Sequence, residues 1–147
     1  YVANISVKDL MDVLEIRASL EGLGASLAAE RRNDEDIKNL EELEVEFEEA
    51  VRTQNIDMLL KKDIEFHECI FKAANNKKLE KMINTLWEQV QRFRITYVSD
   101  SNASLSLIDE HQSILNAIKE GNIADSKKFA IKHIEKAEQF MLEHCTK

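Results

Sequence analysis

Several features that are common in other classes of protein are scarce or missing in this sequence of 147 residues. There is no proline, only three glycines and no low-complexity linker, so the composition fits one domain. Two cysteines, Cys69 and Cys145, are too few for a disulfide framework and favour a reducing compartment. No apolar run approaches the roughly 20 residues that cross a bilayer, and no charged-then-apolar leader opens the chain. We therefore expect a cytoplasmic protein that does not enter a membrane.

Acidic residues outnumber basic ones, with 28 Asp and Glu against 20 Lys and Arg. The formal net charge is −8, and the segment 34–49 (DEDIKNLEELEVEFEE) is densely acidic. Such a surface repels a phosphate backbone, so this chain on its own is expected to bind DNA poorly. The simplest interpretation of the acidic segment is the solvated face of a helix.

Strand-like alternation is absent beyond a few residues, whereas apolar residues recur at helical spacing along almost the whole chain. The pattern therefore predicts an all-α fold. A first helix is expected from Ser6 to about Arg31, because Ser6 and Asp9 form a capping-box start. Asn33 and Asn55 are expected to precede a second and a third helix.

Further along the chain, the pair Asn75-Asn76 is expected to separate the third helix from a fourth. Residues 99–106 (SDSNASLS) are predicted to form a loop, because their short side chains compete for backbone hydrogen bonds. A fifth helix then ends at Gly121, which suits a left-handed cap, and a sixth helix follows. Gly22 and Gly24, inside the first helix, are interpreted as close-packing positions, since no strand precedes them to form a phosphate loop.

Four metal-ligating side chains lie on the apolar stripes of these helices. Asp63 and His67 are one turn apart on the third helix, while His111 and His133 lie on the fifth and sixth. No basic residue on the same turns neutralises the carboxylate, and a buried ionisable group is costly unless it is paired or coordinated. The pattern predicts a metal site formed by these four residues.

The heights of the four residues along the bundle agree with this prediction. In an antiparallel hairpin around Gly121, His111 and His133 stand at roughly 15 and 18 Å from the turn. His144 lies about 16 Å further along its helix than His133, too far to share an ion. Cys69 points away from His67 and is interpreted as an ordinary small buried residue.

The four side chains indicate which metal ions suit the site and what kind of small molecule suits a position beside the ion. Three imidazoles and one carboxylate suit zinc, nickel, manganese or iron better than calcium or magnesium. A position left open on such an ion suits a small carboxylate. Arg17 and Arg94, at inner positions of their helices, are candidates to clamp that carboxylate. For Arg17 the alternative is an ion pair with Glu21, one turn on, and we leave both interpretations open.

Three segments resemble the FadR C-terminal domain (FCD), the ligand-sensing half of many bacterial transcription regulators of the GntR family. They are EIRASLEGLGASLAAERRNDEDI at 15–37, DIEFHECIFKAANN at 63–76 and EHQSILNAIKEGNIADSKKFAIKHI at 110–134. The D-x-x-x-H, the EH and the closing H stand at the family's metal positions.

The resemblance implies an antiparallel bundle of six or seven helices with a divalent ion at its centre and an organic acid beside it. In such regulators an N-terminal winged helix-turn-helix domain binds DNA as a dimer. Residues 1–5 are too few for that domain, so the resemblance implies a linker end at 1–5 and an effector-binding domain at 6–147. DNA would then be bound only through the N-terminal domain, with the whole regulator a homodimer.

A metal-dependent enzyme is the alternative from another functional class, because open positions on the ion can activate water or oxygen. Glu65 and Glu68 are the nearby acidic residues, and neither shares the apolar stripe of Asp63 and His67. Since no general base is evident, we expect a sensor and not an enzyme.

Overall fold

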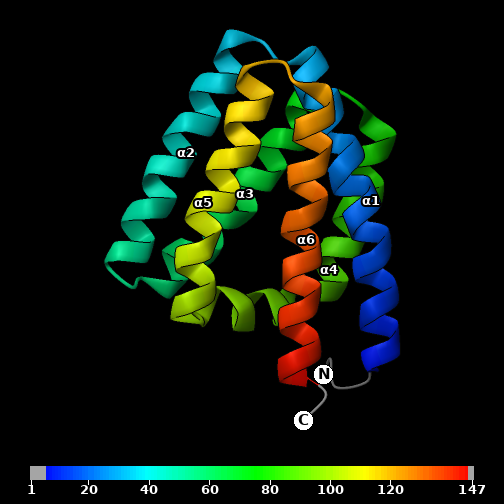
Figure 1. Ribbon diagram of the computed structural model, residues 1–147, viewed down its shortest axis with the longest axis vertical. Helices are drawn as coiled ribbons and strands as arrows, with labels where there is room; N and C mark the ends of the chain where they lie inside the picture. The colour runs from blue at the N-terminus through cyan, green and yellow to red at the C-terminus, as the bar shows by residue number, and fades with distance from the viewer. Residues whose placement is uncertain (1–5, 146–147) are drawn as a thin grey trace.

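The computed structural model describes residues 6–145, and this part of the chain forms six α-helices that run alternately up and down (Figure 1). The helices are α1 Val7–Arg31, α2 Asp34–Arg52, α3 Ile56–Ala74, α4 Lys77–Ser99, α5 Ser101–Lys119 and α6 Ile123–Cys145. The all-α prediction is confirmed. None of the six is both long and apolar enough to span a membrane.

Short polar side chains start most of these helices. At the start of α1, the Ser6 hydroxyl accepts a hydrogen bond from the backbone N–H of Asp9. Asn33 and Asp36 form a reciprocal capping box at the start of α2. Asn75 adopts a left-handed conformation at the end of α3, and Gly121 does so after α5, with φ +71°. The helix ends at these positions are therefore confirmed.

The predicted loop at 99–106 is wrong, because α4 continues to Ser99 and α5 begins at Ser101. Asp100 caps α5 by accepting from the N–H of Ala103. The hydroxyls of Ser99 and Ser104 donate to backbone carbonyls of their own helices, and that of Ser106 donates to the Glu110 carboxylate one turn on, so these side chains are satisfied within the helix. Burial of Leu107 also favours the helix, and tertiary packing here outweighs local propensity.

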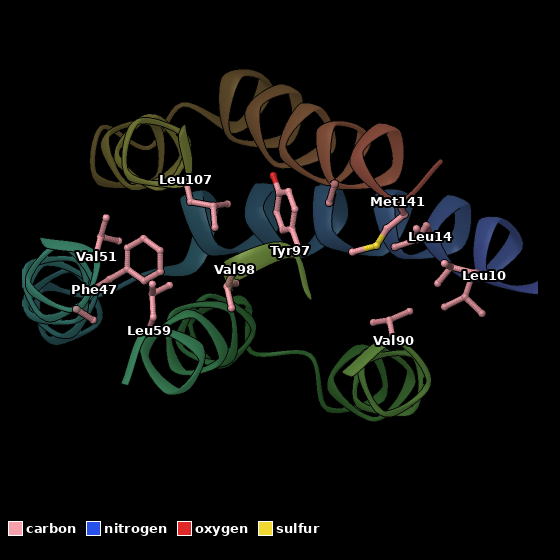
Figure 2. Packing of buried hydrophobic residues seen from close by; sticks show 13 residues of the cluster. Leu10, Leu14, Phe47, Val51, Leu59, Val90, Tyr97, Val98, Leu107 and Met141 are labelled. Atoms are coloured by element: carbon pink, nitrogen blue, oxygen red, sulfur yellow. The ribbon is translucent and has the colours of Figure 1, made fainter. Parts of the chain in front are cut away.

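Two apolar clusters bracket a polar layer at mid-height of the bundle. On α1, Leu10 and Leu14 belong to one cluster and Ala25 to the other, and on α5 His111 lies between Leu107 and Ile114. Figure 2 shows the first cluster, in which side chains from all six helices meet at the end of the bundle where α1 begins and α6 ends. It contains Leu10, Val13, Leu14, Phe47, Ala50, Val51, Leu59, Val90, Tyr97, Val98, Leu107, Ala137 and Met141.

Helix α1 packs against α3, α4, α5 and α6, and its two internal glycines allow part of that contact. A Cβ at Gly24 would lie 2.6 Å from the Phe71 ring on α3, and one at Gly22 would lie 2.7 Å from Ile131 on α6. The interpretation of both glycines as close-packing positions is confirmed.

Gly24→Ala is expected to destabilise the protein by about 1–2 kcal/mol, because overpacking outweighs the gain in helix propensity. The Phe71 ring is rigid and buried against Trp87, so it has little room to move. Gly22→Ala is the matched control, since its Cβ would meet the half-buried Ile131 side chain and not a buried aromatic ring, and its effect should be smaller. Urea unfolding measures both variants, and equal stability of Gly24→Ala and the wild type would contradict the packing argument.

Candidate metal centre

The four predicted ligands come together in the polar layer. Asp63 and His67 are on α3, His111 is on α5 and His133 is on α6, and each side chain is at least 95% buried. The three histidines each place a ring nitrogen within 4.8 Å of those of the other two. Asp63 is outside that compact set, yet its Oδ1 lies 3.1 Å from His111 Nε2 and 3.6 Å from His67 Nε2.

The spacing of these atoms suits coordination of one ion. His67 Nε2 and His133 Nε2 are 3.3 Å apart, and the Asp63 Oδ1 distances are similar. Neighbouring ligands that bind one ion at about 2.1 Å stand roughly 3.0–3.4 Å from each other. These three separations are therefore about those that a transition-metal ion requires, whereas Asp63 lies outside the set of donors that are all within 4.8 Å of one another.

Each of the three histidines is also paired with a glutamate that the sequence did not single out as part of the site. His67 Nδ1 lies 3.0 Å from Glu21 Oε1, His111 Nδ1 lies 3.0 Å from Glu44 Oε1, and His133 Nδ1 lies 2.7 Å from Glu110 Oε1. An ionised carboxylate only accepts hydrogen bonds, so each Nδ1 carries the proton and donates.

The buried carboxylates around the histidines outnumber the buried guanidinium groups, and a cation would balance this excess of negative charge. Because a glutamate contacts Nδ1 of each ring, the Nε2 atoms of His67 and His133 face each other at 3.3 Å, where a cation between them would serve both. Among the described residues, four carboxylates surround the histidines and only two guanidinium groups are buried with them. These are Asp63, Glu21, Glu44 and Glu110, with Arg17 and Arg94. Because excess buried charge is costly, the residues present fit a divalent cation.

The surroundings shift the pKa values of the ligands in opposite directions. Burial, together with the two neighbouring imidazoles, lowers the pKa of His133 to about 4, so this ring is neutral at pH 7. Burial also disfavours the charged form of His111, but its bonds to Asp63 and Glu44 raise its pKa to about 9. Burial likewise opposes ionisation of Asp63, yet Arg94 and His111 hold the pKa of that carboxyl well below its usual range.

The two arginines, Arg94 and Arg17, pair with different carboxylates. Arg94 Nε donates to Asp63 Oδ2 over 3.0 Å, so this carboxylate has a basic partner, although none was expected on the same turns of its own helix. The neighbour comes from α4, and helical spacing on α3 could not reveal it. The Nη1 and Nη2 atoms of Arg94 are buried and have no hydrogen-bond partner among residues 6–145. Arg17 Nε instead lies 3.1 Å from Glu21 Oε2, which is the ion pair that was its alternative.

The two residues that were set apart from the site lie away from it. His144 is exposed, and its ring stacks on Phe140 at 3.8 Å between centroids. Cys69 is half-buried, and burial raises the pKa of its thiol to about 11. Neither side chain contributes to the group of three histidines.

Surface grooves reach the edge of the site at His133 and Glu110. A groove of about 190 Å³ is lined by both residues together with Lys132 and Lys136. A neighbouring groove of about 440 Å³ is lined by Glu110, Lys136 and Tyr97, among others. The centre is therefore nearest to solvent at His133, and Lys132 and Lys136 line the groove there.

Comparisons with known proteins agree on one family. The family model described as the FCD domain matches residues 12–136. The regulator LutR of Bacillus subtilis is 27% identical over 139 residues, which cover 91% of this chain and 63% of the relative. The Nta operon transcriptional regulator of Aminobacter aminovorans is also 27% identical over 139 residues, covering 95% of this chain and 64% of the relative. The chain thus spans less than two thirds of the length of these relatives.

Solved structures share the fold. E. coli McbR/YncC superposes with a TM-score of 0.87 at 18% identity, covering 96% of this chain and 71% of that one. Streptococcus agalactiae GntR superposes with a TM-score of 0.79 at 24% identity, covering 93% of this chain and 62% of that one. At these identities the likeness establishes the helical bundle, and the function needs separate support.

Proposed function

The chain belongs to the FCD domain family, and from this premise we propose that it senses a small organic acid through a divalent metal centre. The family and the curated relatives are transcription regulators and not enzymes, so the metalloenzyme alternative is set aside. In this proposal Asp63, His67, His111 and His133 hold zinc, nickel, manganese or iron. The bound ion supplies a Lewis-acid position for a carboxylate oxygen.

The observation that carries the proposal is the orientation of Arg94 beside this centre. Its Nε is fixed on Asp63, while Nη1 and Nη2 are buried without a partner. Buried donors of this kind nearly always find an acceptor, and a guanidinium edge matches the two oxygens of a carboxylate. Arg17, which is already paired with Glu21, is the second candidate contact for the acid.

The proposed consequence is a population shift that reaches another domain. An acid that binds one arrangement of the helices better than another favours that arrangement in proportion to the difference in affinity. Helix α1 is tied to the centre, because its Glu21 bonds with His67 on α3. We propose that a winged helix-turn-helix domain precedes α1 in the whole regulator, which binds DNA as a homodimer in the cytoplasm. The linker end assigned to residues 1–5 lies outside the described residues.

A thermal-shift screen tests this function directly. Protein loaded with zinc or nickel is mixed with monocarboxylic acids, which bind free metal too weakly to strip the ion. At about 100 times its Kd, a true effector adds about 2.7 kcal/mol, or roughly 5–10 °C in Tm for a domain of this size. The same acids should have no effect after chelation. Stabilisation that survives complete removal of metal would contradict a metal-centred acid site.

A further inference from the structure

The three glutamates that contact the histidines come from helices α1, α2 and α5. Glu21 reaches His67 on α3, Glu44 reaches His111 on α5, and Glu110 on α5 reaches His133 on α6. In every pair the glutamate contacts Nδ1, and in none does it contact Nε2. The same contact is made at all three rings and joins three different pairs of helices. This repetition indicates that the three glutamates have the same structural role.

We propose that Glu21, Glu44 and Glu110 are positioning residues that hold each imidazole with Nε2 towards a shared cation. The inference rests on the metal centre of the proposed function, but it does not depend on the acid. A carboxylate that accepts from Nδ1–H fixes the tautomer and the ring orientation, and it makes the opposite nitrogen more basic. The Nε2 atoms of His67 and His133 thereby face each other, and those of His67 and His111 face Asp63 Oδ1.

The three glutamates differ in the contacts they make besides the histidine. The glutamate with the fewest other contacts gives the clearest test of the proposal. Glu21 Oε2 also accepts from Arg17 Nε and from Trp87 Nε1, so its removal would leave two other buried donors without a partner. Glu44 is different, because Oε1 contacts only His111 among the described hydrogen bonds and Oε2 has no partner. A change at Glu44 therefore acts on His111 and on little else.

Glu110 offers an independent second test. Its side chain is 9% exposed at the groove beside His133, where Oε2 accepts from the Ser106 hydroxyl at 2.7 Å and lies 3.8 Å from Lys136 Nζ. In Glu110→Gln the amide oxygen can still accept from His133 Nδ1–H or from the Ser106 hydroxyl. This variant therefore tests the proposal at the edge of the bundle, independently of the fully buried Glu44 position.

The experiment compares zinc affinity by chelator competition in Glu44→Gln, Glu44→Leu and Glu110→Gln. Glutamine keeps an acceptor oxygen but loses the charge, whereas leucine loses both. We expect zinc affinity to fall roughly tenfold in the glutamine variants and up to about 100-fold in Glu44→Leu. Glu42→Gln is the matched control, because it makes the same charge change at an exposed position of α2 and should leave affinity unchanged.

A second readout separates positioning from a merely structural role. In the zinc-loaded protein labelled with ¹⁵N, each ligand ring should show a protonated Nδ1 and a metal-bound Nε2. Glu44→Leu should alter this pattern for His111 alone, and Glu110→Gln should weaken the protected Nδ1–H signal of His133 alone. Zinc affinity within twofold of wild type in all three variants, or unchanged ring signals, would overturn the proposal.

The outcomes also distinguish this inference from the proposed function. Wild-type protein that binds no transition metal would overturn both. Wild-type protein that binds zinc, with glutamate variants that bind equally well, would overturn only the positioning role. Glutamate-dependent zinc binding without any response to acids would uphold the positioning role and remove the sensing function.

Discussion

His67→Ala is expected to lower zinc affinity by more than about 100-fold, which exceeds the loss typical of residues that only support a ligand. His67 Nε2 lies 3.3 Å from His133 Nε2 and 3.6 Å from Asp63 Oδ1, so it belongs to the most closely spaced donors of the site. Its removal leaves a gap that no neighbouring donor fills. Metal content after purification without added metal, followed by titration with zinc, measures the effect.

The variant should still fold, which keeps this result interpretable. Glu21 loses one donor in His67→Ala but retains Arg17 Nε and Trp87 Nε1. The matched control is His144→Ala, which removes an exposed imidazole from α6 and should leave zinc affinity unchanged. Undiminished metal content in His67→Ala would remove this residue from the proposed ligand set.

Period and spacing predict the six helices, apart from the loop wrongly assigned to 99–106, and they identify the residues that meet at mid-height. Asp63 and His67 lie four residues apart on one apolar stripe. His111 and His133 lie at similar sequence distances from Gly121, which places them at similar heights along an antiparallel hairpin. Both relations follow from the rise and turn of an α-helix alone. The structure brings these residues together in the polar layer, while the binding of metal by them stays a prediction.

The sequence could not reveal the partners that tertiary packing supplies. Glu44 lies inside the acidic segment 34–49, where one buried carboxylate looks like its solvated neighbours. Glu110 adjoins His111 in the chain but contacts His133, and Arg94 reaches Asp63 from a different helix. The one available clue was the spacing of Arg17 and Glu21 on an apolar stripe, which indicated that α1 carries buried charge.

The polar layer draws on every helix of the bundle, although only α3, α5 and α6 supply the proposed ligands. Helices α1 and α2 contribute Glu21 and Glu44, and α4 contributes Arg94. A change at the centre therefore acts on all six helices without a long chain of contacts. This connectivity gives an acid bound beside the ion a physical route to α1, where the proposed DNA-binding domain would attach.

Arg94→Gln is expected to weaken binding of the effector acid by roughly 30- to 150-fold, or about 2–3 kcal/mol, because hydrogen bonds between charged groups are lost. Arg94→Lys should lose less, since an ammonium keeps the charge but not the paired donors. Trp87, the single tryptophan, provides the readout, because Arg94 Cζ lies 5.5 Å from its ring and Glu21 joins its Nε1 to the ligand His67. Quenching or enhancement of its fluorescence during titration with acid gives the affinity directly.

Zinc affinity should change far less than acid affinity in the Arg94 variants, because none of the four proposed ligands is removed. Arg92→Gln is the matched control, since Arg92 is exposed two residues earlier on α4 and faces away from Trp87. If Arg94→Gln binds zinc and the acid as tightly as wild type, the unpartnered Nη atoms of Arg94 do not hold the carboxylate. Arg17 would then be the candidate to bind the acid, and its ion pair with Glu21 would have to break first.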